Sequence, residues 1–427
     1  MTATPTLPPL LRVRQHFSRT RVEDVPAEIR NQLAALTGNG RVQAGQRVAL
    51  AVGSRGIASL PVMASTVIEE LKALGAKPFI VPSMGSHGGG TAEGQIAMLG
   101  TLGITAEGLG CPIEATMDSP ALVTLPSGLP IHFSAAALAA DHVLMLNRIK
   151  LHTGFTGPYQ SGMAKMLLLG LGKHEGAKAI HAASRRLSFE EIVTTALPAL
   201  LPQIPLLGGL AVIENAFEEV GRIQAVPAER ILAEEPALLE NSIEWMPQLP
   251  FEEIDVLVID RIGKNLSGTG LDTNVVSRKI HDNHAMPGER PAVHRIVARA
   301  LTDETRGNAL GVGLCEFITD RLKNAINFEY TYVNAVTSNH VAGCKMPPSF
   351  PTDRATIEAA VASMFDLDPA ALRMVRIRST LELTELEASP ALRAEIEANA
   401  NLEIISEAQP WPFDNAGALA DLEFNEH

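Results

Sequence analysis

Short apolar runs alternate with helical patterns through the first half of the chain. Apolar residues fill most of 47–52 and 77–82, and between these runs, from Ser59 to Leu74, they recur at helical spacing. A second helical pattern covers 91–102, and a further strand is expected within 141–152. The centre of this last segment is continuously apolar, so both faces of its sheet should be covered, as they are in parallel sheets. The pattern predicts an α/β fold.

A second unit of the same kind is predicted from about residue 250. A strand at 252–260 leads into a glycine-rich turn and a helix from Asn274, and a strand at 331–339 precedes a helix at 353–365. The chain has 427 residues, which is more than a single hydrophobic core usually organises. Two domains are therefore expected.

The predicted fold class is α/β, with two α/β domains, mostly parallel sheets and the active site in the cleft between them. Residues 1–250 are expected to form an N-terminal catalytic and cofactor-binding domain. Residues 251–400 are expected to form a C-terminal α/β domain that closes the substrate site, and 401–427 a tail that packs back on the first domain.

The charge of the chain argues against several classes of partner. Its 48 acidic and 35 basic residues give a formal net charge of −13, which repels the phosphates of nucleic acid. Segment 192–213 is uncharged, but prolines interrupt it, so we interpret it as a helix end, a loop and a strand rather than a membrane span. The start lacks a signal-peptide pattern and the three cysteines are widely spaced. We expect a cytoplasmic protein with no nucleic-acid or membrane partner.

Three successive predicted strands are followed by residues suited to chemistry. Arg55 follows the first, His87 lies in a glycine-rich loop after the second, and His152 ends the third. Glycine allows a ligand to approach the backbone closely, and ligands of parallel sheets bind beyond the carboxyl ends of the strands. We expect the three side chains to share one site.

Lys165 is the least ordinary lysine of the sequence, because the six residues after it, from Met166 to Leu171, are all apolar or glycine. The ordinary interpretation is a lysine in a first helical turn whose ammonium reaches water. The preceding Ser161-Gly162 is typical of a helix N-cap. A lysine with little water has a lowered pKa, so its amine can serve as a nucleophile or as an attachment point for a cofactor.

His181 follows Lys165 by sixteen residues, which on one continuous helix would place the two about 160° apart. If they share a site, the helix must break between them, and Gly170, Gly172 and Gly176 offer break points. His174 lies on the same helical face as His181, so spacing alone does not choose between these two histidines.

Two further signals are weaker. His281 and His284 have the spacing to chelate a metal from one helical turn, although their charged and amide neighbours favour a solvated surface. The stretch GKNLSGTG, which contains Lys264, could bind phosphate through backbone amides but fits neither the Walker nor the Rossmann spacing. We interpret it as a substrate loop.

Together these elements resemble the nickel-dependent lactate racemase family. The matches are the arginine loop VGSRG, the G-x-H of Gly85 to His87, His152 followed by SGMAK with Lys165, and His181 at its distance from that lysine. A partial match of the family's GxxLDxN pattern lies at 268–274. The resemblance covers roughly residues 45 to 280.

The resemblance implies a cofactor and a role for each matched residue. Members of this family hold a nickel-pincer nucleotide (nickel pyridinium-3,5-bisthiocarboxylic acid mononucleotide) on a lysine, and the position of that lysine corresponds to Lys165. Binding of the cofactor is implied for Arg55, Ser161 and Gly162, and nickel ligation for His181. Square-planar nickel suits an imidazole beside sulfur and carbon donors.

The implied reaction is racemisation or epimerisation of a 2-hydroxy acid, with His87 and His152 as acid/base catalysts while a hydride leaves Cα and returns to it. The implied substrate-binding residues are Arg55, Lys264, Ser277 and Lys279. The expected partners are the small 2-hydroxy acid and the host enzymes that make the cofactor.

Several positions depart from the family pattern. Val52 replaces an acidic residue, and Val276-Ser277 and the shifted Lys279 replace a Tyr-Gln pair and a lysine, so a 2-hydroxy acid other than lactate is expected. Two alternatives remain open. One is a cofactor-binding protein without turnover, and the other is a hydro-lyase or isomerase with an ordinary divalent metal bound by His87, His152 and His181.

Overall fold

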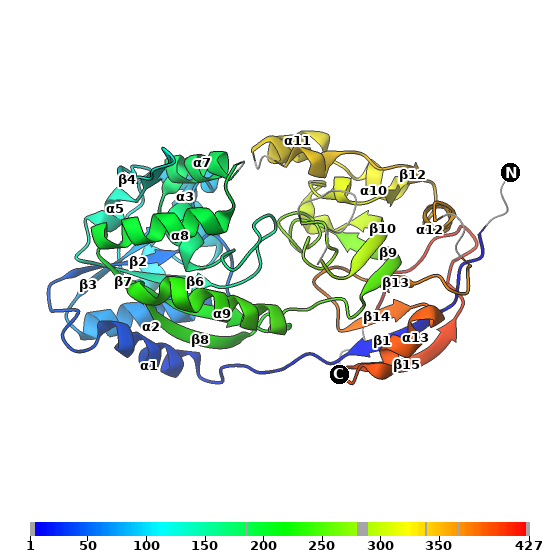
Figure 1. Cartoon of the computed structure of the whole chain (residues 1–427), viewed down its shortest axis with the longest axis horizontal. Coiled ribbons are helices and arrows are strands. Elements are labelled where there is room, and N and C mark those ends of the chain that lie inside the picture. Colours follow the sequence, from blue (N-terminus) through cyan, green and yellow to red (C-terminus); the bar gives the residue numbers. More distant parts are fainter. Residues whose placement is uncertain (1–4, 185, 280–288, 338–339, 365–367, 424–427) are drawn as a thin grey trace. The chain divides into compact units, whose positions relative to one another are not determined.

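The computed structural model describes residues 5–184, 186–279, 289–337, 340–364 and 368–423. Within this part the chain forms two compact units, shown in Figure 1. The N-terminal unit is Ser18–Met246, and the C-terminal unit contains the described residues up to Phe17 and from Pro247 onward. Each unit combines a mostly parallel sheet with helices, which confirms the predicted α/β class.

The N-terminal unit follows the predicted alternation of strands and helices. Its elements are α1 Val25–Thr37, β2 Arg47–Val52, α2 Leu60–Ala73, β3 Lys77–Pro82, α3 Ala92–Thr101, α4 Ala106–Leu109, β4 Ala121–Thr124, β5 Pro130–His132, α5 Ala135–Leu138, β6 His142–Arg148, α6 Met163–Lys165, α7 Lys173–Ala183, α8 Phe189–Leu200, β7 Leu206–Glu214, β8 Val220–Pro227 and α9 Ile231–Trp245.

Five of these strands form one sheet in the order β3-β2-β6-β7-β8, in which only β8 runs antiparallel to its neighbour. Successive strand residues point into two different cores. Ala49 packs with α8 on one face, and Leu50 packs with α1 and α2 on the other. Figure 1 shows α1 and α2 on the opposite side of the sheet from α8. Coverage of both faces explains why the strands are apolar at nearly every position.

The helix that carries Lys165 breaks before His181, as the sequence predicts. A π-helical turn, Met166–Gly170, separates α6 from α7. Lys173, the first residue of α7, has a φ of +56°, while Gly176 lies inside α7. A lysine therefore occupies the left-handed conformation where a glycine was expected.

The segment 192–213 forms the end of α8, a 3-10 turn at Leu201–Gln203 and β7, as predicted. Across the described ranges, we find no helix with the length and apolar character that a bilayer span requires.

The C-terminal unit contains β1 Leu10–Gln15, β9 Glu253–Ile262, β10 Ala292–Leu301, β11 Phe317–Thr319, α10 Asp320–Asn324, α11 Phe328–Thr337, β12 Ser349–Phe350, α12 Asp353–Ala362, β13 Met374–Ile377, β14 Glu385–Ala388, α13 Arg393–Ala398 and β15 Leu402–Gln409. Its sheet has the order β12-β11-β10-β9-β13-β14-β1-β15, with parallel strands from β12 to β13 and antiparallel strands beyond.

The first and the last strand of the chain, β1 and β15, both lie in this sheet, which differs from the expected domain limits. β1 pairs with β14 and with β15, and Leu11 and Val13 are fully buried in the core of the C-terminal unit. Trp411 is buried as well, and its indole N–H donates to the Pro8 carbonyl over 2.9 Å. Residues 402–423 therefore pack within the C-terminal unit, whereas 401–427 was expected to be a tail against the first domain.

Two local predictions for the C-terminal unit are wrong. Residues 331–337 are helical, within α11, although Thr, Tyr and Val favour strands. The side chain of Asn327 accepts the Tyr330 N–H over 3.1 Å, a contact that caps the start of the helix and favours it over a strand. The segment from Asn274 forms consecutive turns up to Ser277, whose φ of +52° interrupts helical geometry.

Candidate functional site

Reactive side chains follow the carboxyl ends of the parallel strands of the N-terminal unit. Arg55 follows β2 and His87 follows β3, while β6 ends at Arg148 and β7 at Glu214. These strands are parallel neighbours, so their ends lie along one edge of the sheet. The chain runs from β2 to β3 on one side and from β6 to β7 on the other, so the strand order reverses between β2 and β6. Ligands of open α/β sheets bind at such a reversal.

Four of the predicted site residues share one electrostatic environment. Burial, followed by the charges of Arg55 and Lys165, lowers the pKa of His87 to about 4. Burial is also the main cause that lowers the pKa of His181, with a contribution from Lys165. The pKa of Lys165 falls to about 8 through burial, followed by the charges of Arg55 and Lys150. The structure thus brings Arg55, His87, Lys165 and His181 together.

Arg55, His87 and His181 nevertheless have exposed side chains, and Lys165 is half-buried. Water therefore offsets part of each pKa shift. Every direction shows that added positive charge is unfavourable at this edge of the sheet. A chain with a net charge of −13 that gathers cations in one place is suited to bind an anion there.

The ammonium of Lys165 has no acceptor among the residues that the structure describes, although side chains of the opposite charge are abundant in this chain. The backbone next to Lys165 is held by Glu235 of α9. The carboxylate of Glu235 accepts the Ala164 N–H over 2.9 Å, and complete burial raises its pKa to about 7. Lys165 is therefore fixed at its backbone while its amine is available for a ligand.

The predicted cofactor-binding pair Ser161-Gly162 lies directly before α6, the helix that contains Lys165. Ser161 forms an antiparallel bridge with Lys150, in which each N–H donates to the other residue's carbonyl over 2.9 and 3.2 Å. Gly162 is the N-cap of α6, and a Cβ at this position would lie 2.3 Å from the Glu235 Oε1 atom. Glycine is required here because the buried carboxylate approaches the backbone so closely.

The imidazole of His87 interacts with the loop after β2. Its Nδ1 atom lies 2.5 Å from the Ser54 hydroxyl oxygen. A hydroxyl can donate or accept, so this contact is compatible with a proton on either ring nitrogen. His87 can therefore change its tautomer without losing the contact.

His152 is held in a different way. Its Nδ1 atom accepts the N–H groups of Gly154 and Phe155 over 3.0 and 2.9 Å. A nitrogen that accepts two N–H groups cannot carry a proton, so the neutral ring carries its proton on Nε2. The Phe155 ring stacks on His152 with centroids 4.3 Å apart and lies 6.2 Å from the ring of His181. Phe155 thus connects His152 with the other site residues.

The predicted substrate-binding residues Lys264, Ser277 and Lys279 belong to the C-terminal unit. The Lys264 ammonium donates to the Gly268 carbonyl, which closes the glycine-rich turn on itself. Ser277 is buried, and Lys279 is half-buried with its pKa lowered to about 8 by burial, against the opposing charges of Glu289 and Asp272. Their part in substrate binding stays a prediction, and His281 and His284 lie outside the described residues.

The three histidines His87, His152 and His181 do not form a cluster of the kind that holds an ordinary metal. Within the described ranges, three ligating side chains come within 4.8 Å of one another only at Glu253, Asp255 and His294. There the His294 ring already pairs with Glu253 over 2.7 Å, and Asp255 accepts the Arg373 N–H. These three side chains are close together because they hydrogen-bond within the protein, so their proximity does not indicate a metal site.

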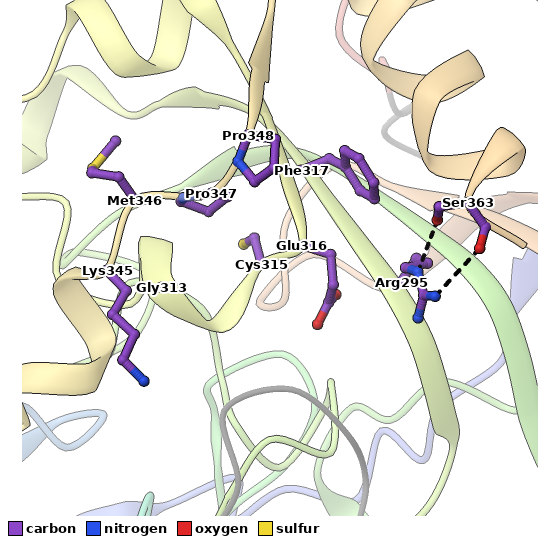
Figure 2. A pocket seen from close by; sticks show the side chains of 10 residues that line it. All are labelled: Arg295, Gly313, Cys315, Glu316, Phe317, Lys345, Met346, Pro347, Pro348 and Ser363. Carbon is purple, nitrogen blue, oxygen red and sulfur yellow. Dashed lines mark hydrogen bonds between the residues drawn. The ribbon is translucent and has the colours of Figure 1, made fainter.

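A cavity of about 420 Å³ lies in the C-terminal unit (Figure 2). It is lined by Arg295, Gly313, Cys315, Glu316, Phe317, Lys345, Met346, Pro347, Pro348 and Ser363. Figure 2 shows the Arg295 guanidinium directed at Ser363, to which it donates through Nε over 2.9 Å. Glu316 accepts the Ile296 N–H over 2.7 Å. These charges are used within the protein, and none of the predicted site residues lines the cavity.

Several residues of the site were missed by sequence reasoning. Arg148 and Lys150 lie at the end of a buried strand, and their charge at that place was a usable signal. Ser54 is next to Arg55 in sequence, but no sequence motif indicates that it contacts His87. Glu235 lies in a helix rich in glutamate, so the sequence contains no sign that this one is buried.

The geometry defines an α/β unit with a cationic, imidazole-containing site at the reversal of strand order. No protein-family model matches the chain, and no curated protein matches it in sequence. Among the solved structures that are similar to it are two from thermophilic bacteria. The lactate racemase apoprotein from Thermoanaerobacterium thermosaccharolyticum is 13% identical, with a TM-score of 0.48, over 84% of this chain and 96% of that one. A Thermotoga maritima protein is 14% identical, with a TM-score of 0.46, over 65% of this chain and 72% of that one.

Proposed function

We propose that this protein is a racemase or epimerase of a 2-hydroxy acid and that Lys165 carries a nickel-pincer nucleotide. The observation that carries the proposal is the environment of Lys165. Its amine has a pKa lowered to about 8, it lacks an acceptor in the described part of the chain, and it lies with Arg55, His87 and His181 at the reversal of strand order. The sequence motifs that place these four residues match the family pattern.

The residues fit the chemistry of such a group. A lysine amine must be neutral to form a thioamide, and a lowered pKa raises the neutral fraction near pH 7. A histidine must be neutral to ligate nickel, and the lowered pKa of His181 keeps it so. Arg55 offers paired N–H donors to a phosphate or a carboxylate. When bound, the nucleotide would supply a hydride acceptor for the substrate Cα.

The two remaining histidines suit the movement of the hydroxyl proton. His87 can take the proton on one nitrogen while Ser54 adapts to the other, which is what a general base requires. His152 carries its proton on Nε2 as long as Nδ1 accepts the two backbone N–H groups, so it is suited to donate a hydrogen bond to the substrate oxygen. A base role for His152 requires its ring to turn and give up those two contacts.

The experiment is a racemisation assay on protein produced together with the enzymes that make the cofactor. Single enantiomers of 2-hydroxy acids of different size and charge are incubated in D2O, and products are separated on a chiral column. We expect inversion of at least one acid without deuterium at Cα, because the hydrogen leaves and returns as hydride. Lys165→Ala is the control and should be inactive. Loaded protein that inverts none of the acids, or that incorporates deuterium at Cα, would contradict the proposal.

A further inference from the structure

Lys173 is buried in the N-terminal unit, and the proposed reaction does not use it. Its side chain is 0% exposed, and burial lowers its pKa to about 8. It also has the left-handed φ of +56°, which is unfavourable for any residue with a side chain. A buried lysine in a strained conformation is costly, so hydrogen bonds that only a lysine can make at this place must compensate.

Those hydrogen bonds lead to the loop that carries His87. The Lys173 ammonium donates to the Pro82 carbonyl over 2.5 Å, at the end of β3, and to Gln95 Oε1 over 3.1 Å. Gln95 lies in α3 and is fully buried. Its Nε2 group donates to the Gly85 carbonyl over 2.8 Å and reaches the His87 carbonyl at 3.5 Å.

The direction of this chain of hydrogen bonds is fixed by Lys173. An amide has one accepting and one donating end, and both ends of a buried glutamine can be exchanged by a rotation. Because the lysine can only donate, Gln95 must turn its oxygen toward Lys173 and its NH2 group toward the loop carbonyls. Without Lys173, the opposite orientation would direct an oxygen at the Gly85 carbonyl.

The loop needs such support. Gly85, Gly88, Gly89 and Gly90 all have φ between +58° and +67°, and glycine is the residue with the greatest conformational freedom in an unsupported loop. Gly85 is also tightly packed, since a Cβ there would lie 3.0 Å from the Leu169 carbonyl oxygen. The segment that contains Lys165 and Lys173 therefore holds the start of the loop.

We propose that Lys173 and Gln95 are positioning residues that hold His87 in place for proton transfer. The proposal rests on the proposed function of His87 and adds two residues to it. The action is geometric, because the charges that act on the His87 ring are those of Arg55 and Lys165. A displacement of a catalytic group by about 1 Å can lower a rate by about 10²-fold.

The experiment compares Lys173→Met and Gln95→Glu with the control Lys178→Met, which alters an exposed lysine of the same helix. Gln95→Glu keeps an acceptor for Lys173 but removes the donor to Gly85. In loaded full-length protein, kcat should fall about 10- to 100-fold in both variants, with KM changed less than kcat and the control unchanged. Lys173→Met and Gln95→Glu combined should lower kcat by no more than the larger single effect, since the two act through one contact.

A second readout does not depend on turnover. NMR of labelled histidine should show a changed tautomer ratio or titration of His87 in Lys173→Met and Gln95→Glu, and Lys165 should still acquire its adduct. Unchanged kcat together with an unchanged His87 signal would overturn the proposal. If Lys173→Met does not fold, kcat and the His87 signal of Gln95→Glu alone test the proposal. Absence of the adduct in the unaltered protein would instead count against the proposed function, and the His87 signal would still test the positioning role.

Discussion

The two units differ in whether their cations are paired with carboxylates. In the C-terminal unit, Arg299 and Arg376 are almost completely buried, and each is surrounded by carboxylates. Arg299 lies 2.5 Å from Asp260 and 3.1 Å from Asp353, and Arg376 lies 2.9 Å from Asp260 and 3.1 Å from Glu387. These groups connect β9, β10, β13, β14 and α12.

In the N-terminal unit, by contrast, the cations at the strand ends are gathered with few carboxylates. Glu214 pairs with Arg148 and accepts the Ala58 N–H, while Arg55 and Lys165 find no carboxylate partner in the described part of the chain. A cation whose carboxylate partners belong to the same protein has a structural role, and removal of a partner leaves an uncompensated charge. Cations left together without partners are suited to an anionic ligand from outside.

The largest effect is expected for the two histidines of the site. His87→Ala and His152→Ala should each lower racemisation by about 10²- to 10⁴-fold in loaded enzyme, because proton transfer to a positioned group contributes that much. Substitution by glutamine distinguishes the roles of the two histidines, because glutamine can donate a hydrogen bond but cannot act as a base. Since His152 carries its proton on Nε2, His152→Gln keeps a donor and should recover part of the rate, whereas His87→Gln should not. Equal recovery in both variants would remove the distinction between the histidines.

The contrast between the units is tested most directly by stability. Asp260→Asn should lower the free energy of unfolding by about 3–5 kcal/mol, because it leaves Arg299 and Arg376 without their shared carboxylate. Lys165→Met removes a half-buried ammonium that has no described partner and should leave stability unchanged or raise it. Urea unfolding followed by circular dichroism measures both. A large loss in Lys165→Met would mean that this lysine is structural.

A smaller effect is expected for Glu235→Gln. At pH 5 the buried side chain is a neutral carboxyl group that accepts backbone N–H groups beside Lys165. A glutamine keeps only one accepting atom, so the free energy of unfolding should fall by about 1–3 kcal/mol at this pH. The raised pKa of Glu235, about 7, means that the folded protein holds a proton that the unfolded chain loses above about pH 4.5. Its contribution to stability therefore falls as the pH rises from 4.5 to 7, and the variant should lack this slope.

The smallest perturbation is chemical labelling without mutation. A lysine with a lowered pKa has a larger neutral fraction at pH 7 than an ordinary lysine. Lys165 and Lys279 are half-buried and have lowered pKa values, whereas Lys173 also has a lowered pKa but is inaccessible. A limiting amount of an acylating reagent should therefore mark Lys165 and Lys279 before the exposed Lys178, as read by peptide mass spectrometry. Preferential labelling of Lys178 would contradict the lowered pKa values.

Local patterns predicted much of this molecule. The strands β2, β3, β6 and β9 follow their apolar runs, and the end of a parallel strand is a position that sequence can identify, which is how Arg55 and His87 were found. Glycine and helical spacing also indicated the break between Lys165 and His181.

The remaining features depend on contacts between distant parts of the chain. β1 pairs with β14 and β15, and no local pattern specifies a partner so far along the chain. The burial of Glu235, Gln95 and Lys173 cannot be predicted from sequence either. Their neighbours in sequence are ordinary helical residues, and only the packed structure removes them from water. In α11 the helix forms despite side chains that favour strands, with a capping contact from Asn327 at its start.

The central claim is that Lys165 carries a nickel-containing nucleotide, and the mass of the tryptic peptide that bears Lys165 tests it most directly. The protein should be produced with the cofactor-making enzymes, beside a known racemase as a loading control, and its nickel content measured. The account predicts a thioamide adduct on Lys165 with about one nickel per chain, and loss of both in Lys165→Ala. An unmodified Lys165 without nickel, in a preparation where the control is loaded, would contradict it.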